Sequence, residues 1–399
     1  MTPKTTPPPV PAAREQRSLS TYEGWVAYAE RPARTRPDQL TREQRAALPA
    51  AQRTGYDEAR RGWHANILLR TRQVEGIYED LWDLVDSNLQ DADRVKSAAA
   101  IEAPPALGKS TAVNNFGRMF HQQRIADAGR YLDPDGDVVH LPVCHITLPG
   151  RTTVKGLHMM ILGFYAHPAV AGILHRSMAG RDLARAAADC IERHDTRLVI
   201  VDDLHFLNMR TRDGVEVANQ FKWLANEYNA TFLFAGVALR ERGLVGEGST
   251  AKDEAAMAQT FRRWTVLTMD PFTLRDKPGR EQWERLLWHI EQALVLTDAR
   301  EGMLLDQSRY LFARSTGHIG SLMDLIRRGA SRAIRTGREV LDRQLLDGIR
   351  IDEGAEAERG ELQARLDQEA RIQKQRRRRP RPQPPAEPDV PGQSERPAA

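Results

Sequence analysis

The sequence has few cysteines and no long apolar run. Cys144 and Cys190 are the only cysteines among 399 residues, too few for a disulfide framework or, by themselves, for a zinc site. No transmembrane helix is expected, because no stretch of roughly eighteen apolar residues is present, and no signal peptide opens the chain. These absences predict a soluble, cytoplasmic protein without a membrane partner, in which both cysteines are reduced core residues.

The excess of positive charge is small and unevenly placed. The formal net charge is +4, but the chain from Arg371 onward holds eight basic and three acidic residues, a sum of +5, so the body before it is near −1. A nucleic-acid-binding surface on the folded part would therefore be local. The basic tail would hold DNA or an acidic partner through charge, or serve only as a solubilising extension.

The chain divides into four parts by composition. Residues 1–52 form an extension that is partly disordered, 53–277 an α/β domain, 278–352 a small helical domain, and 353–399 a disordered Pro- and Arg-rich tail. Helical patterns separate the strands of the α/β domain, which predicts a parallel five-stranded sheet flanked by helices. The expected strands are residues 97–102, 138–148, 197–204, 231–236 and 264–269.

The stretch Ala100–Asn115, AIEAPPALGKSTAVNN, reads as a strand, a compact loop and the start of a helix. This layout suits a phosphate, because successive backbone N–H groups converge on it and the helix adds its positive dipole end. Lys109 would reach the β- and γ-phosphates of ATP, and the Ser110 hydroxyl would ligate Mg²⁺. The nucleotide-binding residues of this loop are predicted to be Ala103, Pro104, Pro105, Ala106, Leu107, Gly108, Lys109, Ser110 and Thr111.

The loop departs from the usual G-x-x-x-x-G-K-[ST] pattern. Ala103 stands at its first position, where alanine costs more than glycine if the residue needs a positive φ. Pro104 and Pro105 donate no N–H, so the donors would come from Ala106 onwards. The alternative interpretation is a chance Gly-Lys-Ser sequence at a turn.

A second segment, which is acidic, has the composition expected opposite the Gly-Lys-Ser loop. Leu198–Val201 is continuously apolar, as expected of a parallel strand buried on both faces, and Asp202 and Asp203 follow at its carboxyl end. Asp202 would hold Mg²⁺, and Asp203 would polarise the attacking water. The alternative is a pair of solvated carboxylates that cap the next helix.

Several motifs resemble those of AAA+ ATPases, and of the TniB/TnsC group of transposition ATPases in particular. The Ala103–Ser110 loop resembles the AAA+ Gly-Pro-Pro-Gly-x-Gly-Lys-Thr loop with two glycines turned to alanine. The TniB/TnsC likeness is carried by YDEARRGWHANILLRTRQV (Tyr56–Val74), LPGRTTVKGLHMMI (Leu148–Ile161) and STGHIGSLMDLIRRGASRAIRTG (Ser315–Gly337). The resemblance implies an AAA+ P-loop NTPase domain followed by a helical lid domain.

The resemblance also implies a function. Such ATPases form ATP-dependent homo-oligomeric rings or filaments on double-stranded DNA, link a TniQ-like target selector to the transposase, and are disassembled by ATP hydrolysis. Two other hypotheses stay open: a replication-initiator or helicase-loader-like ATPase, and a scaffold that binds ATP with little hydrolysis. An adenine contact near Ile67–Val74 is a further option, with plain core packing as its alternative.

Further site residues follow from the resemblance by position. Arg151, Thr153 and Lys155 fall where the family lines its DNA channel, although a solvated basic turn is the alternative. Arg262 and Arg263 stand where AAA+ subunits offer an arginine finger, or form a surface pair beside Trp264.

The lid motif leaves the nucleotide contact open. His318 lies where many AAA+ proteins carry a second-sensor arginine, and it would contact nucleotide or only cap and pack. Asp203 replaces the usual glutamate of AAA+ proteins. Because Asp203 is shorter and the loop carries alanines, hydrolysis is expected to be slow and stimulated by DNA or a partner.

Overall fold

A computed structural model describes most of the chain. It covers residues 17–90, 96–150, 152–170, 178–204, 216–217, 219–221, 223–224, 230–239 and 264–378. Arg151, Arg262 and Arg263, together with the two ends of the chain, lie outside the described residues. Their predicted roles therefore stay predictions.

The centre of the molecule is a five-stranded parallel sheet, which confirms the predicted fold class. Its strands run in the order β2-β3-β4-β1-β5. Every residue of β3 and β4 is buried, which is why these strands read as apolar runs rather than alternating patterns. The strands are β1 (Ala98–Glu102), β2 (Val143–Thr147), β3 (Leu198–Asp202), β4 (Thr231–Gly236) and β5 (Trp264–Thr268).

Helices cover the sheet and bury its apolar faces in one large hydrophobic cluster. In α4 the buried residues Val74, Ile77, Leu81 and Val85 recur at helical spacing, and Phe116 and Phe120 do the same in α5. α6 packs against α7, and α1 against α5. These helices are α1 (Tyr22–Ala29), α4 (Arg72–Gln90), α5 (Lys109–Ala128), α6 (Val154–Phe164), α7 (Gly180–Arg193) and the short η1 (Pro168–Val170).

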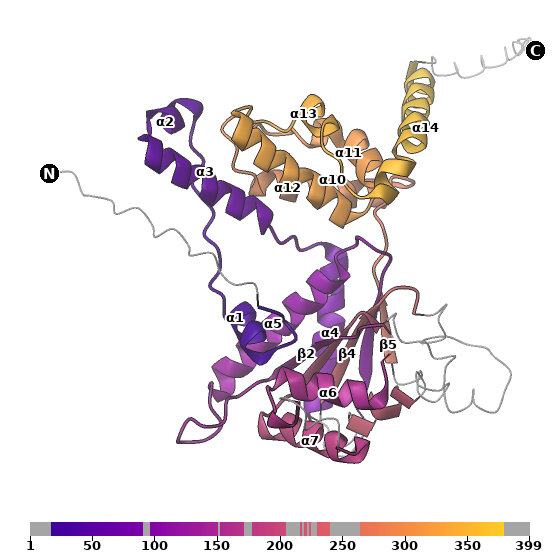
Figure 1. The fold of residues 1–399 in the computed structure, drawn as a ribbon. Helices are drawn as coiled ribbons and strands as arrows, with labels where there is room; N and C mark the ends of the chain where they lie inside the picture. Colours follow the sequence, from indigo (N-terminus) through magenta and orange to yellow (C-terminus); the bar gives the residue numbers. More distant parts are fainter. Residues whose placement is uncertain are drawn as a thin grey trace, which may run out of the picture.

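The chain after β5 is helical and has its own hydrophobic cluster around Trp283, Leu311 and Ile326. Figure 1 shows these helices at one end of the molecule, above the carboxyl edge of the sheet. The spacing of apolar residues in the sequence predicts a helix over Ile319–Thr336, and α12 has these bounds. The elements are α10 (Lys277–Ala293), η4 (Leu305–Gln307), α11 (Ser308–Ser315), α12 (Ile319–Thr336), α13 (Arg343–Asp347) and α14 (Glu353–Arg378).

The prediction that the chain is disordered from residue 353 is wrong for residues 353–378, which form α14. Composition alone misled here because apolar residues are few in this segment. Two of those present, Ala355 and Leu366, are buried, and α14 packs against α11. An ion pair adds to this packing, since Arg314 Nη2 lies 3.0 Å from Glu356 Oε1.

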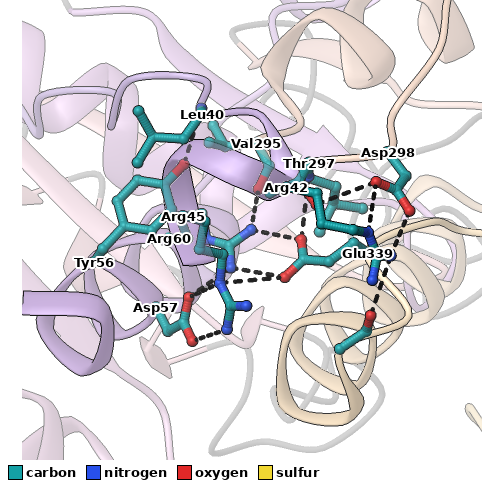
Figure 2. A network of polar contacts seen from close by, with 12 residues as sticks. Leu40, Arg42, Arg45, Tyr56, Asp57, Arg60, Val295, Thr297, Asp298 and Glu339 are labelled. Carbon is teal, nitrogen blue, oxygen red and sulfur yellow. Dashed lines mark hydrogen bonds and ion pairs between the residues drawn. The ribbon is translucent and has the colours of Figure 1, made fainter. Parts of the chain in front are cut away.

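The helix over residues 50–65, which precedes α4, packs on the C-terminal helices. The sequence grouped residues from 53 onward with the α/β domain, but α3 (Ala50–Ala65) contacts α12 of the C-terminal helices, and α2 (Arg42–Ala47) precedes it. Figure 2 shows the reason in a network of polar contacts. The buried Arg60 pairs with the buried Glu339 at 2.7 Å and with Asp57 at 2.6 Å.

None of the described helices is long and apolar enough to span a bilayer. The two cysteines are free and buried, as expected.

Candidate nucleotide-binding site

The loop between β1 and α5 has the backbone of a phosphate cradle. Gly108, with φ +82°, precedes the helix, and Lys109 is its first residue. The first N–H groups of α5 therefore point out of the helix end without intrahelical partners, as an anion site requires. A positive φ also occurs at Ala106, at 59°.

The expected cost at Ala103 does not arise. Ala103 is not among the residues with positive φ; it is buried, and its N–H donates to the Gly236 carbonyl at 3.3 Å. The left-handed strain lies at Ala106 instead, where an L-residue is disfavoured by roughly 1–2 kcal/mol.

The structure brings the predicted lysine and aspartates together at the carboxyl edge of the sheet. Burial lowers the pKa of Lys109, and the negative charges of Asp202 and Asp203 oppose that shift. Lys109 and Asp202 are both buried, and Asp202 Oδ1 accepts a hydrogen bond from the Asp203 N–H at 2.8 Å. A partly desolvated ammonium beside two carboxylates is suited to a triphosphate with its divalent cation, since both charges would then be matched.

The oxygen ligands present suit magnesium. A serine hydroxyl on the first turn of α5 and a carboxylate at the end of β3 are the hard donors that Mg²⁺ prefers. Ser110 and Asp202 are the residues that would hold it, with water and phosphate oxygens completing its shell. Asp203, at φ 59°, begins the loop after β3.

A cavity of about 380 Å³ lies beside the nucleotide loop. It is closed on one side by Leu107–Gly108 and Thr111, and on the other by α12. Ile67 and Val74, weighed in the sequence as adenine contacts or core, are buried in the hydrophobic clusters and also line this cavity. Core packing and an adenine contact are therefore compatible for these two residues.

The start of α12 rests directly on the nucleotide loop. The Gly320 N–H donates to the Ala106 carbonyl at 2.7 Å, and a Cβ at Gly320 would lie 2.5 Å from that oxygen. A Cβ at Gly317 would lie 2.3 Å from the Phe272 carbonyl oxygen. The glycines of Thr-Gly-His-Ile-Gly thus allow close backbone packing of the C-terminal helices on the loop and on the segment after β5.

His318 is tied to its own turn. Its Nδ1 lies 2.9 Å from Thr316 Oγ1, and it is not among the residues that line the cavity beside the loop. His318 stands at the N-cap position of α12, but its side chain makes no capping hydrogen bond to that helix, and a nucleotide contact stays a prediction.

Sequence reasoning missed Arg327, two turns beyond Gly320 on α12. Its guanidinium donates to the Ile67 carbonyl at 3.1 Å and lines the cavity, and burial lowers its pKa. Among the described atoms its Nε is buried without a hydrogen-bond partner. The i to i+7 spacing from Gly320 was the available signal, because it places both residues on one side of a helix.

The predicted DNA-binding residues lie elsewhere. Thr153 caps α6 by accepting from the Gly156 N–H at 3.1 Å, and Lys155 Nζ donates to the Met178 carbonyl at 3.3 Å. Figure 1 shows α6 at the opposite end of the molecule from α12. The structure therefore places these two residues near each other, but it does not test a DNA contact.

The strand order, the loop after β1, the acids after β3 and the helices above the loop define the class: the fold is that of the AAA+ P-loop NTPases. The family model described as "AAA domain" matches residues 92–244. A comparison with curated protein sequences gave no match.

Two solved structures are similar to this chain, and the first of them shares its fold. The Aeropyrum pernix ORC1 protein, in complex with DNA, has a TM-score of 0.52 at 14% identity over 75% of this chain and 69% of its own. The Aeropyrum pernix ORC2 protein, solved as ADPNP–ADP complexes, has a TM-score of 0.48 at 15% identity over 72% and 71%.

Proposed function

We propose that this chain is an ATPase that acts on DNA. The observation that carries the proposal is the meeting of Lys109, Asp202 and Asp203 beneath the start of α12. Lys109 binds phosphate oxygens, Ser110 and Asp202 hold Mg²⁺, and Asp203 orients the attacking water. Arg262 or Arg263 of a neighbouring subunit completes the site as the finger.

The test is phosphate release and nucleotide uptake, with and without duplex DNA. Lys109→Ala removes the cation that grips the phosphates, so nucleotide uptake should fall at least tenfold. Asp203→Asn removes the base while retaining a similar shape, so turnover should fall with nucleotide uptake kept. Lys277→Ala, at a lysine whose side chain is 82% exposed on α10, is the matched control and should change neither.

Two results would contradict the proposal. If Lys109→Ala binds ATP as well as the wild type does, the nucleotide does not bind at the loop between β1 and α5. Uptake without steady phosphate release, under every DNA condition, would leave only the ATP-binding scaffold.

The finer proposal is regulation of transposition. It is supported by the three segments that resemble TniB/TnsC proteins, of which Ser315–Gly337 is the most specific. The structure gives this segment a physical role, because Gly317 and Gly320 pack on the linker after β5 and on the nucleotide loop. In this function the chain oligomerises on duplex DNA and joins a transposase to a TniQ-like selector.

The second candidate is a replication initiator. The reason to weigh it is that the Aeropyrum pernix ORC1 protein, solved in complex with DNA, shares the fold of this chain. Electron microscopy of the protein on random duplex with a non-hydrolysable ATP analogue separates the two. Rings or filaments that form on any DNA sequence and recruit a transposase support the role in transposition. Assembly only at a particular DNA sequence supports a replication initiator.

A further inference from the structure

A row of arginines lies on α12 outside the cavity beside the nucleotide loop. Arg328, Arg332 and Arg335 are spaced by four and three residues, which places them on one face of the helix. Together with Arg350, from the turn after α13, they line a shallow hollow of about 380 Å³.

Backbone contacts hold two of these side chains in place without neutralising them. Arg328 Nη1 donates to the Arg350 carbonyl at 2.7 Å, and Arg332 Nη1 donates to the Gly348 carbonyl at 2.7 Å. A carbonyl fixes a guanidinium but leaves its charge, and the remaining N–H groups stay available as donors. Within the described part of the chain, Asp324 is the one carboxylate paired with this row, 3.4 Å from Arg328 Nη2.

The row continues onto α3. A second hollow of about 380 Å³ shares Arg335 with the first and adds Arg61. Asp57 also lines this hollow, but its carboxylate is already paired with Arg45 at 2.5 Å and with Arg60 at 2.6 Å. We call Arg61, Arg328, Arg332, Arg335 and Arg350 the basic track.

The basic track is extended rather than enclosed. From Arg328 to Arg335 the helix alone rises about 10 Å, so the track suits a line of charges better than one small anion. Duplex DNA presents such a line, with one negative charge per roughly 1.7 Å of its axis. Guanidinium groups also match phosphate oxygens in pairs, which ammonium groups do not.

We propose that the basic track binds the phosphate backbone of duplex DNA without reading bases. The inference rests on the proposed action on DNA and extends it with a second surface. The predicted contacts at Thr153 and Lys155 lie on α6, at the other end of the molecule in Figure 1. The track therefore holds a second stretch of duplex, apart from the one at α6.

The experiment is the salt dependence of duplex binding by the full chain without nucleotide, measured by fluorescence anisotropy. In Arg335→Gln/Arg350→Gln two phosphate contacts are lost, so the slope of log K against log salt should fall by about 1.8. Between roughly 1 M and 0.1 M salt, this change in slope weakens binding by about 60-fold relative to the wild type. Arg335→Lys/Arg350→Lys keeps the charge and should restore most of the slope.

The matched control is Arg280→Gln/Arg285→Gln, which removes the same charge from exposed positions of α10. It should leave the slope unchanged. An unchanged slope in Arg335→Gln/Arg350→Gln, or an equal loss in the control, would overturn the proposal. Polyglutamate binding that depends on the track while duplex binding does not would assign the surface to an acidic protein instead.

ATP turnover of the wild type and of the same variants, measured with and without duplex DNA, separates the two proposals. A wild type without turnover under either condition, whose duplex binding still depends on the track, refutes the ATPase and retains the inference. Normal ATP turnover together with duplex binding that does not depend on the track retains the ATPase and refutes the inference.

Discussion

At the scale of single residues, two alanines of the nucleotide loop differ: Ala106 has a strained backbone, and Ala103 is packed in the core. Ala106 has a φ of 59° and is exposed, whereas Ala103 is buried without a positive φ. Both positions are glycine in the loop that this one resembles, but only one of the two substitutions has a backbone cost. The same loop is fixed from above by the Gly320 N–H.

Ala106→Gly should stabilise the protein. Glycine relieves the left-handed strain, and after its own entropic cost the gain is about 0.5–1 kcal/mol. Ala103→Gly is the matched control, and it should destabilise by about 1 kcal/mol because it loses a buried methyl group. Urea unfolding of both variants measures the difference, and equal effects of the same sign would contradict the assignment of strain.

Gly320→Ala should push α12 off the nucleotide loop. Its Cβ would lie 2.5 Å from the Ala106 oxygen and 3.1 Å from the Ala106 Cα, and backbone atoms cannot turn aside as a side chain can. A loss of about 1–3 kcal/mol in the free energy of unfolding is expected, together with weaker ATP uptake. Gly163→Ala on α6, where no atom lies within 4 Å, should instead be neutral or slightly stabilising. Similar melting temperatures for the two variants would count against this contact.

At the scale of elements, a buried ion-pair network joins α3 to the C-terminal helices. Arg60 is fully buried, and its two terminal nitrogens lie 2.7 and 2.9 Å from the two carboxylate oxygens of Glu339. The Thr297 N–H also donates to this carboxylate, at 3.1 Å. Figure 2 shows both residues at the centre of the network.

Glu339→Gln should therefore be strongly destabilising. It leaves the Arg60 charge buried with less compensation, which costs about 3–5 kcal/mol. The control, Glu281→Gln, disrupts an exposed pair with Lys277 at 3.6 Å and should cost less than about 0.5 kcal/mol. Circular dichroism during thermal unfolding compares the two, and a small loss in Glu339→Gln would show that the network is not important for stability.

At the scale of the whole molecule, stability depends on histidines that fold in neutral form. His145 on β2 is buried, stacks on Trp25 at a ring distance of 5.6 Å, and has both ring nitrogens unpaired among the described atoms. Burial lowers its pKa to about 4. In the unfolded chain a histidine takes up a proton near pH 6.5.

The sign of the pH effect follows from this difference. Below pH 6.5 the unfolded state binds a proton that folded His145 does not accept until about pH 4, so stability falls as the pH falls through that window. At pH 5.5 the loss from this residue is about 1.4 kcal/mol. His145→Phe keeps an aromatic ring on Trp25 and should reduce the loss between pH 7 and 5.5. Parallel stability curves for the wild type and the variant would contradict the prediction.

Much of the fold could be predicted because the local signals are strong. The strand Thr231–Gly236 and the helix Ile319–Thr336 have the bounds that their apolar patterns indicate. Lys109, Asp202 and Asp203 were identified from short motifs, since a phosphate loop and the acids of a neighbouring strand must meet at one edge of a parallel sheet. Sequence spacing can identify site residues when the direction of parallel strands determines which residues meet.

The parts that sequence did not yield depend on contacts between distant segments. The position of α3 depends on the Arg60–Glu339 pair, 279 residues apart. The order of α14 depends on a few apolar residues meeting α11, and the role of Arg327 depends on the carbonyl of Ile67. None of these contacts leaves a periodic pattern in the chain.

The sequence by itself determined the parallel sheet, the phosphate loop and the acids opposite it, because burial on both faces and backbone geometry restrict the residues at those positions. Only the tertiary structure decided that Ala106 rather than Ala103 is strained, that the helices after β5 rest on the loop through Gly320, and that arginines from α3, α12 and the turn after α13 form one track. The reason is that strain, close backbone approach and shared charge are properties of positions in space.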